Sequence, residues 1–575
     1  MTCAELKTTL TGRTINGGPL RFTGPLAIHF LPLMPIKILA FLVFLLSCHA
    51  ARAQNDVVND DEKSSFNLNK PEREQWLKNT GAGLFIHFSV DAQLGVVISH
   101  SLVGASDDYV ERFFNELPKT FNPDKFDPRE IATLAKLAGM KYIVFTTKHH
   151  AGFCMWDTKT TDFNITKTPY KKDLLREFVD ATRAAGLDVG LYFSPEDFYF
   201  LHANHIPISR TNVQMDAAMA QKYADYNRRQ CEELMTNYGK IDVLFIDGEP
   251  KEIVKQTCWR IQPNLLITRG AIKTPEQTLP GTPITQPWLS PITIGTAWQY
   301  QPTNERYKSG TQLIDLLVEA RSKGGSLLLN VGPKPNGALP EPQEDRLREL
   351  AAWYFLNHEC IDSVKTWVIN KENNVLFTAK GRDLYAIVTE VPDWKEGERR
   401  TFTLHSVRAL PTTAVSVLGQ NSRIMEYKPN ADVRCTHQQT AAGLVVSVVK
   451  AQRIYDDHRW PNAVVIKLAN VQPAIAEAVT VETTAAQPAA ASTRLSGRLY
   501  NYKDKRVTRA RFAYRAYRGR VETLYADPWQ YSAWVPVGPD GCFGAPVKPP
   551  KGAYEYKAVA EQSGVAVEGD TRLIN

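Results

Sequence analysis

The stretch Ile241-Asp-Val-Leu-Phe-Ile-Asp-Gly248 is a run of apolar, β-forming residues that ends in a carboxylate and then a glycine. A run this apolar predicts a strand of a parallel sheet that is covered on both faces. In α/β barrels the carboxyl ends of such strands carry the catalytic groups. Asp247 is therefore a candidate catalytic residue, although aspartate is also common at helix caps and turns.

Units of the same kind repeat on both sides of this stretch, and their strands are expected to end at His87, Lys148-His-His150, Ser194, Asp247 and Arg269. Alternating strands and helices of this length predict parallel βαβ units. Over residues 66–356 the pattern favours a (β/α)8-type barrel. The expected strands are 83–88, 142–147, 189–193, 241–247, 265–268 and 326–331, and the expected helices are 127–138, 172–185, 213–238, 251–261, 312–323 and 341–355.

The pattern changes near residue 360, where short segments rich in β-branched and aromatic residues begin. Such segments, separated by turn residues, are typical of a β-sandwich, which we place at 357–472. Residues 473–492 are rich in Ala, Thr and Pro and are expected to form a linker. Residues 493–575 are expected to form a second small β-domain, whose aromatic residues would form either its core or a carbohydrate-binding platform.

The N-terminal region, residues 1–53, is typical of a secretory signal. Met34 is a plausible start, the run from Ile38 to Leu46 is apolar, and Ala51-Arg-Ala53 fits a signal-peptidase site. A membrane-spanning helix needs about 20 apolar residues, and this run is shorter. We therefore expect an exported protein, periplasmic or extracellular, with lipid attachment at Cys48 as the alternative, because Leu45-Leu-Ser-Cys48 resembles a lipoprotein processing box.

The composition is that of a folded protein of two or three domains, with 43% hydrophobic and 22% charged residues in a chain of 575. The net charge of +7 comes largely from the first 53 residues, which hold five Lys or Arg and one acidic residue. What remains is too small to indicate binding to nucleic acid or to a membrane surface. No CxxC or other metal-binding cysteine spacing is present, and no metal or cofactor is expected.

The residues at the strand ends include His87, His149, His150, Asp247 and Arg269, which a barrel would bring into one pocket. A metallohydrolase would use the histidines, but no H-x-H or H-E-x-x-H spacing is present. A glycosidase needs two carboxylates beside the scissile bond, with polar and aromatic groups around the sugar. A non-catalytic sugar-binding barrel would keep the same polar groups without needing both acids.

Five stretches, in this order along the chain, together resemble glycoside hydrolase family 29, the α-L-fucosidases. The resemblance covers roughly residues 66–370. It implies an exo-acting, retaining hydrolase on a barrel with an appended β-sandwich, a fucosylated oligosaccharide or glycoconjugate as substrate, and no metal. The stretches are Gly83-Leu-Phe-Ile-His-Phe88, Thr147-Lys-His-His-Ala-Gly-Phe-Cys-Met-Trp156 with Thr161-Asp-Phe-Asn164, Gly190-Leu-Tyr-Phe-Ser194, Val243-Leu-Phe-Ile-Asp-Gly248 and Gly325-Ser-Leu-Leu-Leu-Asn-Val-Gly-Pro333.

The resemblance also implies roles for single residues. Asp247 matches the family's nucleophile, which forms a covalent glycosyl-enzyme. A neutral imidazole both donates and accepts hydrogen bonds, which suits sugar hydroxyls. The positions expected to bind substrate are His87, His149, His150, Tyr192, Phe245 (where the family usually has Trp), Arg269 and Trp298, the last near the C5 methyl group of fucose.

The acid/base residue is less well defined, because family members differ in where it lies. Some carry it in a Thr-x-Glu segment after the strand that ends in arginine, and Thr274-Pro-Glu276 follows Arg269 in this way. Glu276 is therefore the expected acid/base, with Glu249 and Glu196 as alternatives. A carboxylate near Asp247 would have a raised pKa, which would fall once Asp247 is glycosylated.

Several positions depart from the family pattern. Ala151 stands where the family has Asp, Trp288-Leu289 where it has Trp-Glu, and Asn357-His-Glu-Cys-Ile-Asp362 replaces Asn-Gly-Glu-Ala-Ile-Tyr. An early Trp-Tyr pair is not evident near Asp107-Asp-Tyr109. These changes leave open a decorated fucoside, a branched oligosaccharide, an α-L-galactoside, or a glycan-binding barrel with impaired catalysis.

Overall fold

A computed structural model describes residues 66–574, except 212, 392, 456–460, 489–491, 503–506 and 519–526. The expected signal segment (1–53) and Cys48 lie outside this part of the chain. None of the helices in the described part is both long and apolar enough to cross a lipid bilayer.

The N-terminal half is built around a curled, seven-stranded parallel sheet in the order β5-β4-β3-β2-β1-β7-β6. The strands consist largely of buried residues, as expected for a sheet covered on both faces. Their alternate side chains fill the interior of the curl and the layer beneath the helices. The strands are β1 (Ala82–Ile86), β2 (Tyr142–Lys148), β3 (Asp188–Phe193), β4 (Val243–Ile246), β5 (Leu266–Ile267), β6 (Leu289–Thr293) and β7 (Ser326–Val331).

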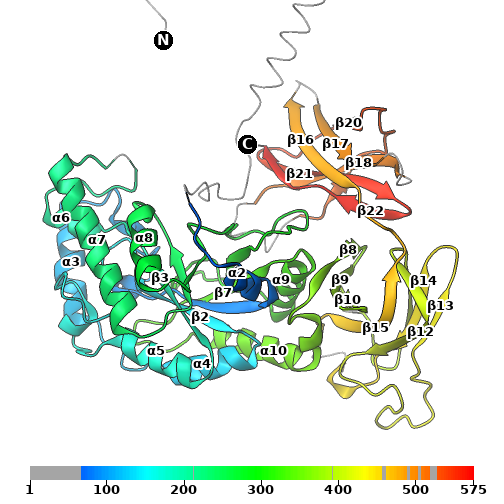
Figure 1. The fold of residues 1–575 in the computed structure, drawn as a ribbon, viewed down its shortest axis with the longest axis horizontal. Coiled ribbons are helices and arrows are strands. Elements are labelled where there is room, and N and C mark those ends of the chain that lie inside the picture. The colour runs from blue at the N-terminus through cyan, green and yellow to red at the C-terminus, as the bar shows by residue number, and fades with distance from the viewer. Residues whose placement is uncertain are drawn as a thin grey trace, which may run out of the picture. The chain divides into compact units, whose positions relative to one another are not determined.

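Helices alternate with these strands and cover the outside of the sheet (Figure 1). Asp127 caps α4 by accepting hydrogen bonds from the backbone N–H groups of Arg129 and Glu130, which confirms the predicted helix start. The long helix expected from residue 213 begins instead at Ala217, where Asp216 caps it. The helices are α2 (Pro71–Asn79), α3 (Asp107–Thr120), α4 (Pro128–Leu137), α5 (Leu174–Ala184), α6 (Phe198–Ala203), α7 (Ala217–Asn237), α8 (Lys251–Ile261), α9 (Gly310–Ser322) and α10 (Glu341–Asn357).

The prediction of a closed, eight-stranded barrel is wrong, because in the part of the chain that the structure describes the sheet has seven strands and its edge strands, β5 and β6, are not paired. Within the segment between them, 268–288, strand-type pairing among the described residues is limited to an isolated bridge between Lys273 and Trp288. It holds four prolines, at 275, 280, 283 and 287, which have no N–H to donate to a strand ladder. A proline-rich loop therefore fills the place of an eighth strand, and this loop carries Glu276.

The expected β-sandwich consists of a five-stranded sheet, β12-β15-β10-β9-β8, and a three-stranded sheet, β11-β14-β13. Most of its buried hydrophobic residues belong to the same hydrophobic core as those of the N-terminal half. The strands are β8 (Lys365–Glu372), β9 (Val375–Lys380), β10 (Asp383–Val388), β11 (Arg399–Leu404), β12 (Val407–Val417), β13 (Thr436–Gln439), β14 (Leu444–Val449) and β15 (Val464–Pro473).

The C-terminal β-domain has its own core, which includes Phe512, Phe543 and Tyr556. The expected linker, 473–492, contains strand β16, whose residues pair with β17 in an antiparallel ladder. The prediction of a linker is therefore wrong for the residues of β16. The strands are β16 (Thr480–Pro488), β17 (Thr493–Tyr500), β18 (Val507–Ala516), β19 (Gln530–Tyr531), β20 (Cys542–Val547), β21 (Tyr554–Gln562), β22 (Val565–Glu568) and β23 (Arg572–Ile574).

Candidate active site

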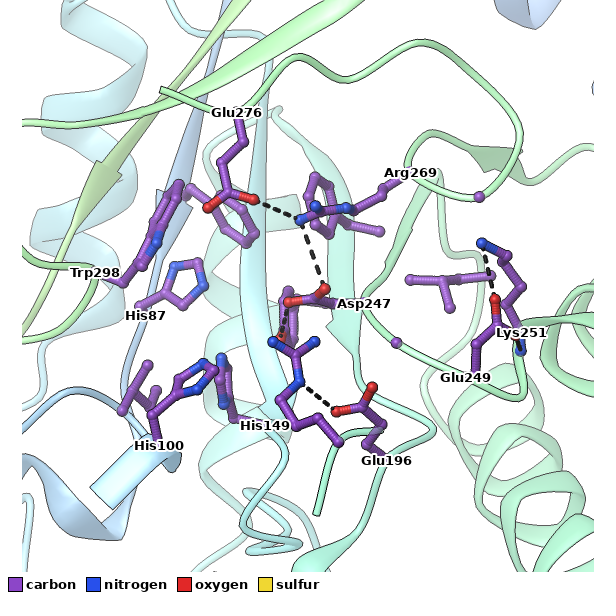
Figure 2. Close-up of a pocket in the computed structure, with 18 residues that line it drawn as sticks. His87, His100, His149, Glu196, Asp247, Glu249, Lys251, Arg269, Glu276 and Trp298 are labelled. Atoms are coloured by element: carbon purple, nitrogen blue, oxygen red, sulfur yellow. Dashed lines mark hydrogen bonds and ion pairs between the residues drawn. The ribbon is translucent and has the colours of Figure 1, made fainter. Parts of the chain in front are cut away.

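A cavity of about 420 Å³ lies at the carboxyl ends of the parallel strands. Figure 2 shows its side chains converging from separate strand ends and loops. The sheet thus gathers residues that are far apart in the sequence, as the strand-end pattern predicted. The residues singled out from the sequence that line the cavity are His87, His149, Tyr192, Phe245, Asp247, Arg269, Glu276 and Trp298, with Glu196 and Glu249.

Asp247 directly follows β4 and is held by two neighbours. The Tyr192 hydroxyl donates a hydrogen bond to its Oδ2 at 2.8 Å, and Arg269 Nη1 lies 3.5 Å from its Oδ1. Burial would raise the pKa of this carboxyl group, but Arg269, the Tyr192 hydroxyl and Arg210 outweigh burial and hold the pKa below its usual value. Asp247 is therefore an ionised carboxylate at neutral pH.

The chain can turn after Asp247 because the next residue is glycine. Gly248 has a φ of +104°, which L residues with a side chain rarely adopt. A Cβ atom here would also lie 2.6 Å from the Glu196 carboxyl carbon. The glycine at the end of the opening stretch thus allows Asp247 and Glu196 to share one pocket.

Arg269 joins Asp247 to a second carboxylate (Figure 2): its Nη1 lies 3.0 Å from Glu276 Oε2. The next residue, Gln277, anchors the loop to β6 through its backbone N–H, which donates to the carbonyl of Pro291, and through its side-chain amide, 3.1 Å from Thr293 Oγ1. Glu276 is thus placed by a loop that is fixed to the sheet, with its carboxylate facing the pocket.

His87 is fixed as a neutral imidazole with a defined tautomer. The Asn330 amide donates through Nδ2 to the Trp298 carbonyl, so its Oδ1 faces His87 Nδ1 at 2.6 Å and accepts a hydrogen bond from the Nδ1–H group. Burial lowers the pKa of His87 to about 4. Nε2 is left as an acceptor at neutral pH, which suits a sugar hydroxyl.

His149 and His150 are held through serine hydroxyls. His149 Nδ1 lies 2.9 Å from Ser99 Oγ, and His150 Nδ1 lies 2.7 Å from Ser194 Oγ. Burial lowers the pKa of both, to about 3 for His150. His149 lines the cavity, whereas His150 is buried behind its wall, with Nε2 3.7 Å from Asp247 Oδ2.

The buried His87 predicts a loss of stability in mild acid. The unfolded chain protonates this imidazole below pH about 6.5, and the folded chain only below about 4, so the unfolded state binds more protons between these values. From pH 7 to pH 5, the free energy of unfolding of the wild type should fall by ~2 kcal/mol more than that of His87→Gln. Urea denaturation at both pH values measures this, and equal losses would contradict it.

The apolar part of the cavity comes from aromatic rings. Phe245 lies 5.0 Å from Phe85 between ring centroids and lies under the Arg269 guanidinium at 5.4 Å. Trp298 packs 4.9 Å from the His87 ring. Aromatic rings beside polar groups match the two kinds of surface that a sugar presents, its C–H face and its hydroxyls.

The alternative acids occupy different positions. Glu196 Oε2 lies 2.7 Å from Arg210 Nε and 3.2 Å from His150 Nδ1, and burial raises its pKa. Glu249 is at the rim, with its side chain 64% exposed and 3.0 Å from Lys251. Among the described ion pairs, Glu276 is joined to Asp247 through Arg269, whereas Glu196 is paired with Arg210, a second cation that acts on Asp247.

The lining residues that were not anticipated include His100 and Arg210. His100 begins a short 3-10 helix (His100–Leu102), and Arg210 lies between α6 and α7. Neither follows a strand, so the pattern that identified the other residues gives no signal for them. Asp107-Asp-Tyr109, where an aromatic pair was sought, forms the first turn of α3.

A metal ion could find three ligand atoms here, since His149, His150 and Asp247 offer one each within 4.8 Å of one another. The Asp247 carboxylate, however, already lies beside the Arg269 cation. We expect treatment with EDTA, followed by desalting, to leave activity within about twofold of that before treatment. A loss that Zn²⁺ or Mn²⁺ restores would show that catalysis uses this trio as a metal site.

Comparison with known proteins gives a consistent result. The model of a family described as "Alpha-L-fucosidase" matches residues 47–359. An α-L-fucosidase of Branchiostoma floridae is 27% identical over 384 residues, 60% of this chain and 84% of that protein. The solved α-L-fucosidase isoenzyme 1 from Paenibacillus thiaminolyticus is 29% identical, with a TM-score of 0.56 over 70% of this chain and 99% of its own. The Thermotoga maritima α-fucosidase in complex with a mechanism-based inhibitor is 25% identical, with a TM-score of 0.53 over 69% of this chain and 96% of its own.

Proposed function

The chain is a glycosidase of the α-L-fucosidase family, whose model matches more than half of it, and we propose that it is an exo-acting, retaining hydrolase that releases terminal α-L-fucose from glycans. Asp247 is the nucleophile in this proposal, and Glu276 is the general acid and base. The substrate is a fucosylated oligosaccharide or glycoconjugate.

One observation carries the proposal: Arg269 Nη1 contacts Asp247 Oδ1 at 3.5 Å and Glu276 Oε2 at 3.0 Å. Because both oxygens contact the same nitrogen, their separation cannot exceed the sum of these distances. This upper limit on the distance between the two oxygens is at the short end of the roughly 6.5–9.5 Å that separates the two carboxyl groups of inverting glycosidases. In retaining glycosidases the two carboxyl groups lie about 5–5.5 Å apart. The geometry therefore supports two carboxylates that act directly on one glycosidic bond.

In the first step, Asp247 attacks the anomeric carbon and forms a glycosyl ester, while Glu276 gives its proton to the departing oxygen. Asp247 suits this task because it is ionised and held by Tyr192 and Arg269. When Asp247 becomes part of the ester it loses its negative charge. The Arg269 guanidinium then stabilises the carboxylate that Glu276 becomes, because Arg269 already contacts both side chains.

In the second step, Glu276 removes a proton from water, which attacks the same carbon and releases the sugar with its original configuration. In this proposal His87 and His149 form hydrogen bonds with the sugar hydroxyls, because both imidazoles are neutral and line the cavity. Trp298 and Phe245 form the apolar wall for the ring and its methyl group.

Hydrolysis of two aryl glycosides tests the proposal. The wild type should cleave an aryl α-L-fucoside and release α-L-fucose as the first anomer seen by proton NMR. The corresponding α-L-galactoside, which adds a hydroxyl where fucose has its methyl, should react about 10-fold to 200-fold more slowly in kcat/KM. Protein that binds both sugars without cleaving either, or that releases the β anomer first, would contradict the proposal.

A further inference from the structure

A cavity of about 790 Å³ is lined by residues of the N-terminal half, the β-sandwich and the C-terminal β-domain. The proline-rich loop that fills the place of an eighth strand contributes residues 277–281 to its wall. This loop is tied to the C-terminal domain, because Asp570 Oδ1 accepts hydrogen bonds from the backbone N–H and the hydroxyl of Thr282, both at 3.2 Å. An apolar cluster that includes Ile369 and Val565 joins the two β-domains. The walls of the cavity are therefore held together by direct contacts.

Cations are in excess among the charged residues of this wall. Seven Lys or Arg and five Asp or Glu line the cavity. Three of the acidic residues form ion pairs with lining cations: Lys323 with Glu319, Arg515 with Glu555, and Lys557 with Glu568. Two acidic residues, Asp570 and Glu390, remain against four cations, Lys273, Lys308, Lys371 and Arg511. The cavity therefore suits a ligand that brings negative charge.

Arg511 lacks a carboxylate partner because of the register of its strand. Alternate residues of β18 share one face of the sheet, and two arginines on the face of Arg511 are paired with the glutamate directly opposite on β21, Arg509 with Glu561 and Arg515 with Glu555. Arg511 lies between these two and opposite Val559, which offers no acceptor in its side chain. Among the described residues, the Arg511 guanidinium forms no ion pair, and its Nε is buried without a hydrogen-bond partner.

Two aromatic rings hold the Arg511 guanidinium in place. Its central carbon lies 3.9 Å from the centre of the Tyr531 ring and 4.2 Å from that of the Trp534 ring. Such cation–π contacts stabilise the group but leave its N–H donors without acceptors. Because Nε is buried, the N–H groups that a ligand can reach are those of the terminal nitrogens. A planar set of charged donors matches an oxyanion, such as a sulfate or a carboxylate, better than a hydroxyl group.

The rest of the wall fits a sugar that carries this oxyanion. The volume lies within the range of about 300–1,000 Å³ typical of small-molecule sites, which is more than one inorganic anion fills. Tyr531 is 47% exposed and offers part of an aromatic ring to the C–H face of a sugar. Asn370 and Asn373 line the cavity too, and an amide both donates and accepts hydrogen bonds, as sugar hydroxyls require.

We propose that this cavity binds an anionic glycan and that Arg511 holds its sulfate or carboxylate group. The inference goes beyond the proposed function, because the residues of this cavity are separate from those that line the catalytic pocket. Acidic glycans are thereby held to the protein at a site that needs no fucose.

Calorimetry at low ionic strength with three fucose-free sugars tests this inference. Lactose, 3′-sulfolactose and 3′-sialyllactose carry no charge, a sulfate and a carboxylate, respectively. At least one of the two anionic sugars should bind the wild type at least tenfold more tightly than lactose, and a comparison of the two identifies the preferred anion. Higher salt should weaken this binding, because it screens the charges.

Substitutions of single cations locate the binding. Arg511→Gln should lower the affinity for the anionic sugar at least tenfold, and Arg511→Lys, which keeps the charge but loses the planar donors, should lower it by less. Lys371→Gln changes an exposed residue of β8 in the same wall and should lower the affinity at least threefold. Arg112→Gln is the matched control, because it removes one positive charge from an exposed position on α3, outside the lining, and it should leave the affinity within about twofold of wild type.

Three results would overturn the inference. The first is equal or undetectable binding of all three sugars, and the second is a preference for an anionic sugar that survives both Arg511→Gln and Lys371→Gln. The third is binding of inorganic sulfate as tight as that of 3′-sulfolactose, which would show a site for an ion and not for a glycan. Because none of the probes contains fucose, each of these results leaves the proposed hydrolysis of fucosides standing.

Discussion

Replacing Asp247 by alanine is expected to lower kcat/KM for an aryl α-L-fucoside by on the order of 10⁴-fold or more. The variant keeps Tyr192, Arg269 and the histidines but lacks the atom that forms the glycosyl ester. Steady-state kinetics measures the loss. Asp247→Asn should lose a similar factor, because an amide is too weak a nucleophile.

Two controls make this result specific to the nucleophile. Asp162→Asn changes a carboxylate whose side chain is 88% exposed, and it should leave kcat/KM within about twofold of wild type. Azide should restore part of the activity of Asp247→Ala and yield the β-L-fucosyl azide, since the anion takes the place of the missing carboxylate. Residual activity within tenfold of wild type would show that Asp247 is not the nucleophile.

Replacing Glu276 by alanine should have the second-largest effect, and its size should depend on the leaving group. For fucosides with poorly acidic aglycones, kcat/KM should fall by about 10²-fold to 10⁴-fold, the range typical of general acid catalysis. For fucosyl fluoride, whose leaving group needs little protonation, the first step should be nearly unchanged. Kinetics over a series of aryl fucosides gives this dependence as a Brønsted slope.

Glu196→Gln and Glu249→Gln are the matched comparisons, because both residues line the same cavity. Neither should steepen the Brønsted slope. Azide added to Glu276→Ala should give the α-L-fucosyl azide, in which the original configuration is retained. A steep slope in Glu196→Gln and a flat one in Glu276→Ala would move the acid/base role to Glu196.

The strand-end residues of the site could be predicted because parallel strands share one edge. His87, His149, Asp247 and Arg269 each follow a buried apolar run, and each faces the cavity. His100 and Arg210 could not be predicted, since they lie in connecting segments whose paths depend on tertiary contacts. Glu276 was expected only through the family resemblance, because a proline-rich loop has no periodic pattern.

The errors in the predicted fold also arise because a sequence pattern does not contain the pairing between distant segments. An alternating pattern of strands and helices predicts the parallel sheet but does not say whether the sheet closes. Closure depends on whether residues 268–288 form a strand that pairs with both β5 and β6, and the four prolines of this segment, which donate no N–H, disfavour such a ladder. The composition of residues 473–492 resembled a linker, but β16 forms there because a partner strand, β17, follows it.

In the proposed mechanism, Asp247 becomes covalently bound to the sugar. Mass spectrometry after incubation with a 2-fluoro-fucosyl fluoride, which slows the release of a glycosyl-enzyme, detects this bond. We predict that the intact protein gains one fluorofucosyl group and that peptide mapping places it on Asp247. A protein that hydrolyses fucosides yet gains no such group, or carries it on another residue, would contradict the account.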